Sequence, residues 1–447
     1  MNRDIFKAYD VRGKVGSELT EVVCQAIGQA FAVWLPNSDG VIAVGRDMRP
    51  DSAKLAGALI DGLKRQGREV WDIGEVTSDM IYFAVGNFGL AGGAMVTASH
   101  NPGEYNGIKF CREEAKPIGI ETGLAEIRDA VAAGEFKMIG KQEPVTSKDV
   151  RNDWVKHVLT FVNPHRWPAY KVAVDAGNGM AGAIIPSLEE FVPLQITPMY
   201  FELDGTFPNH IANPLEAKNL VDLQDTIKNE GLDFGIAFDG DGDRAVLVDE
   251  NGDALSGTVM TAILARYFLE KHPGATILYN AICGRIVPET VEKLGGKAVR
   301  TKVGHSFVKA DMRIYDAVFA GEHSGHYYFK DNYFADSGLI AVVIAIQALS
   351  ESGKKLSELA AEFRKYPVIP ETNFDVDDKQ AMIGKVRAAF TEGKQDDLDG
   401  LTVAYPDRWF NVRASNTEPV LRLNAEAGTQ EALDAMVAGV KEILEGK

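Results

Sequence analysis

Three aspartates alternate with glycines in residues 239–244, which read Asp-Gly-Asp-Gly-Asp-Arg. Two like charges about 4 Å apart repel by roughly 4 kcal/mol at an effective dielectric constant near 20, so a loop that gathers three carboxylates needs a cation. Short apolar runs at residues 234–238 and 245–248 flank the loop and predict strands on both sides. Hard oxygen ligands suit Mg²⁺ or Ca²⁺, and Arg244 adds a fixed charge that can bind a phosphate. The segment therefore predicts a strand–loop–strand metal site suited to phosphoryl chemistry.

The same aspartate spacing also opens the calcium-binding loop of an EF-hand, with Glu250 at its twelfth position. The sixth position of that loop must be glycine to allow a sharp turn, and Arg244 occupies it here. The flanking runs also read as strands. We therefore prefer a Mg²⁺ site to a calcium store or sensor.

The chain has 447 residues, enough for about three or four domains, and its apolar fraction of 45% is ordinary for a globular protein. The formal net charge is −17, which argues against non-specific nucleic-acid binding, because such binding depends on Lys and Arg neutralising phosphates. A local group of cations can still attract a small anionic substrate.

Three widely spaced cysteines, Cys24, Cys111 and Cys283, indicate neither a disulfide framework nor a zinc site. The first residues lack an apolar core of signal-peptide length, and the longest apolar run, residues 339–349, is too short to span a bilayer. We therefore expect a cytoplasmic protein without membrane or nucleic-acid partners. The oligomeric state stays open.

Strand-like and helix-like segments alternate along most of the chain, which predicts an α/β fold with mostly parallel sheets. The strand patterns are residues 41–44, 70–73, 94–97, 172–174, 236–238, 276–279 and 318–320, and the clearest helix patterns are residues 52–66, 220–229 and 339–350. Polar loops at residues 97–102, 239–244 and 321–326 each follow such a strand. Because ligands bind at the carboxyl ends of strands in open α/β sheets, three related domains should face one cleft.

The last part of the chain has a different pattern. Short strands are predicted at residues 402–405, 409–412 and 420–424, with a closing helix at 430–444 and a linker before them at 367–370. The fold class is therefore three related α/β domains with mixed or parallel sheets, followed by a small α+β domain. The predicted domain boundaries are residues 1–150, 151–253, 254–368 and 369–447.

Ser99 lies in a turn after a predicted strand, and Pro102 keeps the residue before it out of helical conformation. The loop lacks the glycines of a nucleophile elbow and the G-x-x-x-x-G-K run of a Walker A loop. One interpretation is a structural serine at a helix N-cap, with an Asx turn at Asn101. The adjacent His100 and the nearby Lys109 favour the other interpretation, a nucleophile.

Five motifs follow one another along the chain, at residues 7–13, 97–102, 239–244, 321–326 and 413–419. They resemble those of the α-D-phosphohexomutases, in the phosphomannomutase/phosphoglucomutase branch, over essentially the full length. The resemblance implies four domains around a central cleft. It also implies an enzyme that interconverts hexose 6-phosphate and hexose 1-phosphate, with mannose, glucose or both as the hexose.

The resemblance further implies a phosphorylated Ser99 and a hexose 1,6-bisphosphate that serves as activator and intermediate. Mg²⁺ is then held by the phosphate on Ser99 and by Asp239, Asp241 and Asp243. Three aspartates and a dianionic phosphoserine sum to about −5, of which Mg²⁺ offsets two, so cations are needed nearby. The candidates are Arg12, His100, Lys109, Arg244, His305 and His326.

Within that set, the resemblance places Arg12, His100, Lys109 and His326 beside the nucleophile. Either Lys109 or His100 is expected to handle the proton, and the sequence does not choose between them. Whether Ser99 is phosphorylated in the isolated protein also stays open.

A sugar that binds in two opposite orientations needs a contact that the flip does not change. The resemblance assigns Glu322 with Ser324 to the ring hydroxyls midway between the two ends, whereas the alternative for Glu322 is a solvated loop acid. The phosphate that is not transferred is assigned to Arg413, Ser415, Asn416 and Thr417, which offer a guanidinium, hydroxyls and loop amides. Tyr9, Lys302 and His305 are expected as secondary contacts. Near Ile282, where many relatives carry a basic residue, Arg285 is the candidate replacement.

Other functions remain as alternatives. Residues 177–182 match G-x-G-x-x-G after a predicted strand, with Glu202 about twenty residues further on, as in an NAD-dependent dehydrogenase. Asp175, just before the glycines, would oppose a pyrophosphate. A sugar phosphatase would use the same serine and metal but has no need of a second phosphate clamp. Among mutases the alternative is phosphoglucosamine mutase, and Asn416 favours hexoses, because the amino-sugar branch more often has glycine there.

Overall fold

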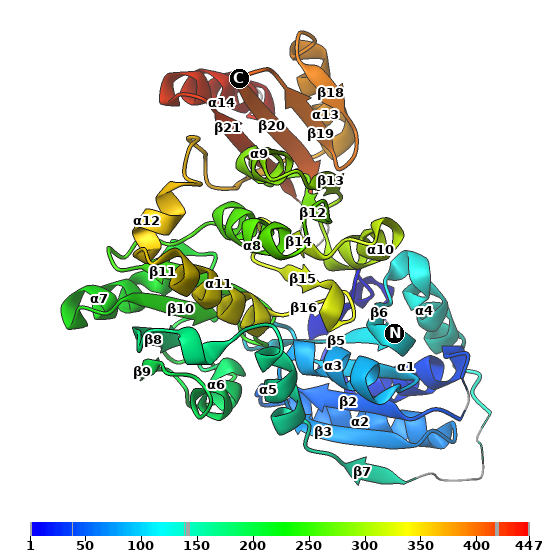
Figure 1. Cartoon of the computed structure of the whole chain (residues 1–447). Helices are drawn as coiled ribbons and strands as arrows, with labels where there is room; N and C mark the ends of the chain where they lie inside the picture. Colours follow the sequence, from blue (N-terminus) through cyan, green and yellow to red (C-terminus); the bar gives the residue numbers. More distant parts are fainter. Residues whose placement is uncertain (1, 38, 138, 140–143, 416–419, 446–447) are drawn as a thin grey trace.

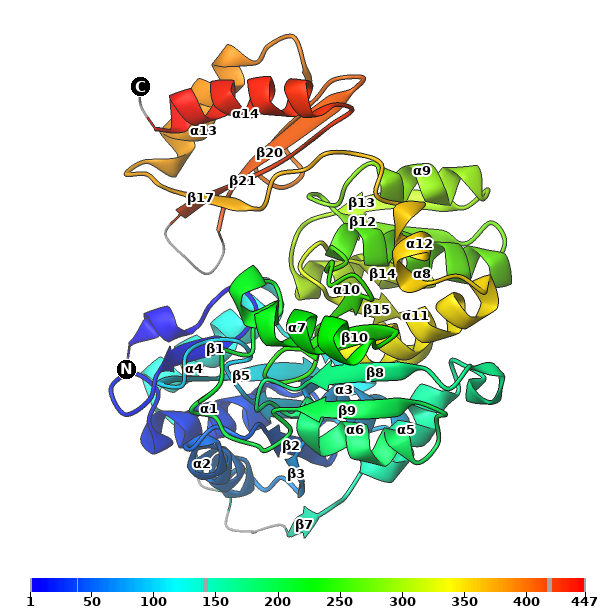
Figure 2. The ribbon, with the colours of Figure 1, turned by 90° about the vertical axis from the view of Figure 1, so that its left-hand side faces the viewer.

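The structure is a computed structural model and describes residues 2–37, 39–137, 139, 144–415 and 420–445. Four separate β-sheets follow one another along this part of the chain, each with its own helices (Figure 1). The first three domains pack against one another, and the fourth stands at one end of the molecule, beside the third (Figure 2).

The sheet of the first domain has the strand order β1-β5-β4-β2-β3-β7, with β6 paired to β5. The strands are β1 Val11–Lys14, β2 Ile42–Arg46, β3 Val70–Glu75, β4 Gly92–Val96, β5 Tyr105–Arg112, β6 Lys116–Pro117 and β7 Val145–Ser147, and the helices are α1 Glu21–Trp34, α2 Ser52–Arg65, α3 Ser78–Phe88 and α4 Leu124–Ala133. The parallel strands β2, β3 and β4 are joined through α2 and α3. β4 is apolar and buried along its whole length, as expected for a parallel strand covered on both faces.

The second domain has the strand order β11-β10-β8-β9. Its strands are β8 Lys171–Asp175, β9 Gln195–Met199, β10 Phe234–Phe238 and β11 Ala245–Asp249, and its helices are α5 Arg151–Leu159, α6 Ala181–Glu189 and α7 Val221–Glu230. β10 runs parallel to β8 and antiparallel to β11. The loop between β10 and β11 carries the three aspartates.

The third domain has the strand order β13-β12-β14-β15-β16. Its strands are β12 Thr276–Asn280, β13 Lys297–Thr301, β14 Phe319–Gly321, β15 Tyr327–Phe329 and β16 Ala335–Asp336, and its helices are α8 Gly257–Lys271, α9 Ile286–Lys293, α10 His305–Tyr315, α11 Gly338–Ser352 and α12 Leu356–Ala361. α11 begins after Ser337, whose side chain accepts a hydrogen bond from Ile340 N and so caps the helix.

The fourth domain is an antiparallel sheet in the order β17-β21-β20-β19-β18, with two helices. Its elements are β17 Thr372–Asp375, β18 Lys394–Asp396, β19 Leu401–Ala404, β20 Arg408–Ala414, β21 Val420–Ala427, α13 Lys379–Ala389 and α14 Gln430–Leu444. The bounds of α14 are those predicted from its periodicity.

These four domains confirm the predicted fold class, but the expectation of mostly parallel sheets was wrong in one respect. β4, β10 and β14 each have a parallel neighbour and also pair with the antiparallel strand that follows them, β5, β11 or β15. The strands on either side of the aspartate loop were predicted, but an apolar run carries no information about direction, and β5 and β15 were not predicted at all. Each of the three polar loops therefore joins a parallel strand to an antiparallel neighbour.

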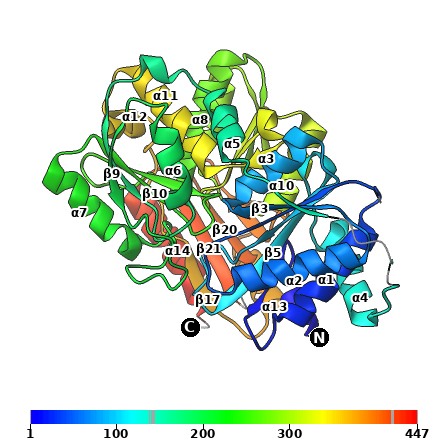
Figure 3. The same cartoon turned by 90° about the horizontal axis from the view of Figure 1, so that it is seen from below.

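The first three domains share one cluster of buried apolar side chains, whereas the fourth has a cluster of its own. α5 packs against both α3 and α11, at the junction of the three domains (Figure 3). Trp154 of α5 and Phe83 of α3 lie there with ring centroids 5.3 Å apart. Among the described residues, no helix combines the length and the apolar character that crossing a bilayer requires.

A buried ion pair of the third domain also contacts an aromatic ring of the first domain. The ammonium of Lys309 in α10 lies 2.6 Å from Asp336 Oδ1 and 3.6 Å from the ring centroid of Tyr82 in α3. The Lys309 and Asp336 side chains are 0% and 2% exposed. Removing one partner of such a pair strands the other charge in the interior, which is more costly than losing an exposed pair.

We expect Lys309→Met to lower the free energy of unfolding by about 3–5 kcal/mol, because the Asp336 carboxylate then has lost its buried partner. Lys330→Met is the matched control, since Lys330 also lies 2.6 Å from an aspartate, Asp316, but at the surface. Its loss should cost less than about 1 kcal/mol. Urea denaturation measures both changes, and equal effects of the two substitutions would contradict the assignment.

Candidate active site

Ser99 lies in the loop between β4 and β5, and its side chain is buried. Its backbone angle φ is +50°, a left-handed conformation that is uncommon for a residue other than glycine. The hydroxyl donates a hydrogen bond to Asp239 Oδ2 at 2.7 Å and lies 3.1 Å from His100 Nδ1. The described chain runs from this loop directly into β5, so the interpretation of Ser99 as a helix cap is wrong.

The aspartate loop brings Asp239, Asp241 and Asp243 together, with one oxygen of each within 4.8 Å of the others. All three side chains are buried. Oδ1 of Asp241 and Oδ1 of Asp243 have no hydrogen-bond partner among the described residues. Clustered carboxylate oxygens with unused lone pairs are the donors that a hard divalent cation takes. The cluster therefore fits a metal ion.

Lys109 of β5 provides a positive charge to this cluster from the first domain. Its ammonium lies 2.6 Å from Asp241 Oδ2 and 2.5 Å from Asp243 Oδ2. Burial alone lowers the pKa of Lys109, but the two carboxylates outweigh it and raise the pKa well above its usual value. Lys109 is therefore protonated in this arrangement, and its ammonium contacts Asp241 and Asp243 rather than Ser99.

Arg244 connects the acid cluster to the nucleophile loop. It donates to Asp239 Oδ2 at 2.9 Å and to Ser99 Oγ at 3.1 Å, and its Nη2 also contacts His100 Nδ1. Burial lowers the pKa of His100 well below its usual value, and the neighbouring cations Arg244 and Arg12 act in the same direction. The His100 imidazole is therefore neutral near pH 7.

Two further segments hold the aspartate loop in place. At the start of α3, Ser78 N donates to the carbonyl of Asp241 at 2.9 Å, and Ser78 Oγ donates to its carboxylate at 2.5 Å. From within the second domain, Met180 N donates to the carbonyl of Gly240 at 2.9 Å. The sequence offered no signal for Ser78, because a serine at the start of a helix reads as an ordinary cap.

Met180 belongs to the G-x-G-x-x-G segment, and this contact decides the role of that segment. The amides of Asn178, Gly179 and Met180 donate to carbonyls within the domain, so they are not available to a pyrophosphate. The dinucleotide-binding interpretation is therefore wrong, and the turn supports the aspartate loop. The EF-hand alternative is wrong as well, since the Glu250 carboxylate accepts hydrogen bonds from Ser357 instead of joining the aspartates.

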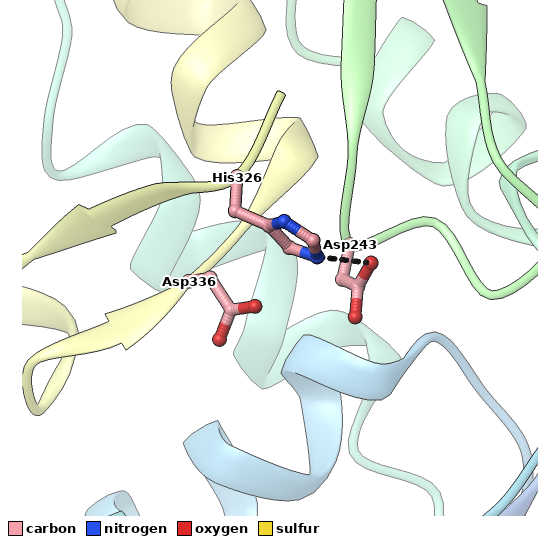
Figure 4. A group of neighbouring side chains, drawn as sticks. All are labelled: Asp243, His326 and Asp336. Carbon is pink, nitrogen blue, oxygen red and sulfur yellow. Dashed lines mark ion pairs between the residues drawn. The ribbon is translucent and has the colours of Figure 1, made fainter. Parts of the chain in front are cut away.

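The third domain contributes the loop between β14 and β15. His326 Nε2 lies 3.6 Å from Asp243 Oδ1, and Figure 4 shows its imidazole between the carboxyl groups of Asp243 and Asp336. Ser324 Oγ lies 3.1 Å from His326 Nδ1. Glu322 is 1% exposed and accepts hydrogen bonds from Asn280, Gly304 N and Tyr328, so it is not a solvated loop acid.

The secondary contacts lie between the first and third domains. Tyr9 OH donates to the carbonyl of Val303 at 3.1 Å, and its ring centroid is 5.3 Å from that of His305. Lys302, the residue before Val303, places its ammonium 5.4 Å from the ring centroid of Phe307. Arg12 is linked to the serine loop, since it donates to the side chain of Asn101.

Arg413 and Ser415 lie together in the fourth domain, and Asn416 and Thr417 fall outside the described residues. Arg413 Nη2 lies 3.2 Å from Glu371 Oε2, an acid that the sequence analysis did not select. Arg285, the candidate replacement near Ile282, has its guanidinium 5.0 Å from the ring centroid of Tyr366 and 3.7 Å from Glu289. Those contacts give no support to a phosphate-binding role for Arg285.

Four family models match successive parts of the chain. They describe phosphoglucomutase/phosphomannomutase alpha/beta/alpha domain I at residues 3–138, domain II at 152–252, domain III at 256–366 and the C-terminal domain at 371–443. The chain belongs to this family. Within the family, it is similar to "Phosphohexose mutases" from Xanthomonas campestris pv. campestris, with 39% identity over 453 residues and full coverage of both chains.

Two further comparisons agree. A phosphomannomutase from Salmonella montevideo is 38% identical over 459 residues, with 99% of each chain covered. The crystal structure of a phosphoglucomutase/phosphomannomutase family protein from Burkholderia thailandensis matches with a TM-score of 0.91 at 32% identity, covering 100% of this chain and 98% of that one. The match extends across all four domains.

The contacts of Lys109 predict that its ammonium and a divalent cation can each neutralise the carboxylates of Asp241 and Asp243. We expect Lys109→Met to lower the free energy of unfolding by about 3–5 kcal/mol in chelator-treated protein, because two buried carboxylates lose their partner. Adding Mg²⁺ or Ca²⁺ should then raise the Tm of this variant more than that of the unaltered protein. Lys116→Met, which removes an exposed pair with Glu114, is the control and should have little effect. A Lys109→Met protein that no divalent cation stabilises would contradict this account.

Proposed function

We propose that this chain interconverts hexose 6-phosphates and hexose 1-phosphates, with Ser99 carrying the phosphoryl group between the two ends of the sugar. The observation that carries the proposal is the 2.7 Å hydrogen bond from Ser99 Oγ to Asp239, which joins a serine of the first domain to the acid cluster of the second. Membership of the phosphoglucomutase/phosphomannomutase family supports the same reaction. Hexose phosphates are the proposed small-molecule partners.

The proposed reaction has two transfers. First, a sugar hydroxyl attacks the phosphorus on phosphorylated Ser99; an O–P bond forms at the sugar, the P–Oγ bond breaks, and Ser99 Oγ gains a proton in exchange for the one the sugar loses. The product is a hexose 1,6-bisphosphate, which turns end to end. Ser99 Oγ then attacks the other phosphate, the bond from that phosphorus to the sugar oxygen breaks, and the proton returns to the sugar.

Little covalent chemistry is left for the protein in such transfers, so positioning and charge neutralisation dominate. The aspartate loop would hold Mg²⁺, which when bound would neutralise charge on the transferring phosphoryl group. Lys109 and Arg244 supply positive charge at the same place, Arg12 contacts the serine loop through Asn101, and His326 lies 3.6 Å from Asp243. Between His100 and Lys109 we favour His100 for the proton on Ser99 Oγ, because its Nδ1 lies 3.1 Å away, whereas the Lys109 ammonium contacts Asp241, Asp243 and Ser78.

The other substrate contacts follow from the loops of the third and fourth domains. We assign Glu322 and Ser324 to the sugar hydroxyls, since the Glu322 carboxylate is buried and held in one orientation by three donors of its own domain. Arg413 and Ser415, with Asn416 and Thr417, would bind the phosphate that is not being transferred. Tyr9, Lys302 and His305 would line the path between these groups. A mannose or glucose phosphate fits this assignment.

Ser99→Ala should lower kcat by about 10³-fold or more, because it removes the group that carries the phosphoryl. Intact-mass analysis after incubation with glucose 1,6-bisphosphate and Mg²⁺ should show one added phosphate on the unaltered protein and none on the variant. Ser147→Ala, at an exposed serine of β7, is the control and should behave like the unaltered protein. Near-normal turnover by the Ser99→Ala protein would refute the assignment.

Substrate choice can be tested with mannose 1-phosphate, glucose 1-phosphate and glucosamine 1-phosphate, each with trace glucose 1,6-bisphosphate. We expect one or both of the first two to be converted to the 6-phosphate, with a clearly higher kcat/KM than the amino sugar. Chelation with EDTA should abolish conversion, and Mg²⁺ should restore it, because the acid cluster would lack its cation. Conversion that survives EDTA, or release of free phosphate in place of the isomer, would contradict the proposal.

A further inference from the structure

Arg49, in the loop after β2, has an unusual set of contacts for a charged residue that is 3% exposed. Its Nη1 donates to the carbonyls of Pro102 and Tyr105 at 2.8 and 2.9 Å. Its Nη2 donates to the carbonyls of Ser99 and Asn101 at 2.8 and 2.6 Å. A guanidinium has five N–H donors in a planar fork, so four of them serve the backbone of the nucleophile loop.

The fifth donor faces a buried carboxylate. Arg49 Nε lies 3.2 Å from Asp47 Oδ2, and Asp47 Oδ1 accepts hydrogen bonds from Arg49 N at 3.1 Å and from Ser52 Oγ at 2.5 Å. The aspartate therefore offsets the charge of the guanidinium at ion-pair distance, without a hydrogen bond between Nε and Oδ2, and the four hydrogen bonds to the carbonyls fix the plane of the guanidinium. Arg49 can act as a rigid template for the four carbonyls without carrying an unpaired charge into the interior.

The loop needs such a template because Ser99 is strained. A left-handed φ on a residue other than glycine is strained and persists only where surrounding contacts enforce it. The Ser99 carbonyl is held from two sides, by Arg49 and by the close approach of Gly240, where an added Cβ would lie 2.5 Å from that oxygen. Loss of the guanidinium fork would let the Ser99 peptide rotate and move Oγ away from Asp239.

Arg49 also joins the nucleophile loop to the second domain. Its guanidinium lies 5.2 Å from the ring centroid of Phe207, a distance at which a cation and an aromatic face attract. A Cβ on Gly205 would lie 2.4 Å from Arg49 Cα, so the two backbones meet there, and one on Gly240 would lie 3.6 Å from the Phe207 ring. Phe207 therefore lies against both the template and the aspartate loop.

We propose that Arg49, stacked on Phe207, is a positioning residue that sets the attack geometry of Ser99. The inference rests on the proposed function, since it concerns how the phosphoryl carrier is aimed. It assigns Arg49 no contact with substrate or metal. Its effect should therefore appear in the rate of phosphoryl transfer and not in the affinity for hexose phosphate.

Arg49→Lys is the main test, because lysine keeps the charge but offers three donors from one point instead of a fork. Phosphorylation of Ser99 is followed by intact mass after mixing the full-length protein with glucose 1,6-bisphosphate and Mg²⁺. A misplacement of about 1 Å costs roughly 100-fold in rate, so we expect phosphorylation and kcat to fall by about 10- to 100-fold. The KM for the hexose phosphate should stay within about twofold, because Arg49 makes no proposed contact with the substrate.

Arg68→Lys is the matched control for a purely structural role. Arg68 is also a buried arginine whose guanidinium donates to main-chain carbonyls, those of Ala32 and Leu35 and also that of Asn37, at the end of α1. The two variants should lose similar stability by thermal unfolding, but the Arg68→Lys protein should be phosphorylated at the unaltered rate. An equal fall in both variants would overturn the proposal, as would an Arg49→Lys protein within about twofold of the unaltered rate.

If Arg49→Lys fails to fold, Phe207→Leu decides the question, because it removes the ring and leaves the guanidinium hydrogen bonds in place. Loss of the cation–aromatic contact leaves the guanidinium less firmly held, so we expect phosphorylation to slow by about three- to tenfold. An unchanged rate would then overturn the proposal. Failure of the unaltered protein to take up phosphate is a different result, because it would refute the proposed function itself.

Discussion

Three carboxylates buried within 4.8 Å of one another are the constraint on which the rest of the site depends. A single domain does not neutralise them, because Lys109 comes from the first domain and Arg244 from the second, while His326 of the third lies 3.6 Å from Asp243. Because Lys109 belongs to the first domain, its attraction to the acids also holds the first and second domains together. The acid cluster therefore has both of its fixed cations only when the first and second domains are packed together.

One topological device places all the reactive loops. In each α/β domain a parallel strand ends in a polar loop and is followed by an antiparallel neighbour, as in β4–β5, β10–β11 and β14–β15. The antiparallel partner holds the far end of the loop, so Ser99, the aspartates and His326 each lie on a segment anchored at both ends. The position of Lys109 on β5 is likewise set by the pairing of β5 with β4. A crossover connection to a helix would anchor the loop less tightly.

The sequence predicted the aspartate loop from residue types in a short, local pattern, and the four domains from the alternation of elements along the chain and the family resemblance. For Ser99 the residues left a helix cap and a nucleophile as alternatives. The sequence predicted the strand after the aspartate loop but not its antiparallel direction, since an apolar run has no direction, and it did not predict β5 or β15. It also missed Arg49, although the loop of Arg49 follows a predicted strand. The partners of this side chain are backbone carbonyls, which every residue carries and which no sequence pattern can indicate. For Glu322, the alternative of a solvated acid fails because the side chain is buried and accepts hydrogen bonds from Asn280 and Tyr328, contacts that the sequence of its loop does not show.

The division between a shared core and a separate fourth domain matches two opposite demands of the proposed reaction. Aiming Ser99 requires fixed distances, and the first three domains supply them through one continuous apolar cluster. Turning a bisphosphate end to end requires the other phosphate to be released from its binding site. Arg413, a proposed residue of that site, lies on a domain with its own apolar cluster. That domain meets the third through polar contacts, such as Val303 N to Asp399 at 2.9 Å and Arg285 N to Glu426 at 3.0 Å. Polar interfaces between domains permit relative motion more readily than apolar ones, which would let the proposed binding site release its phosphate without moving Ser99.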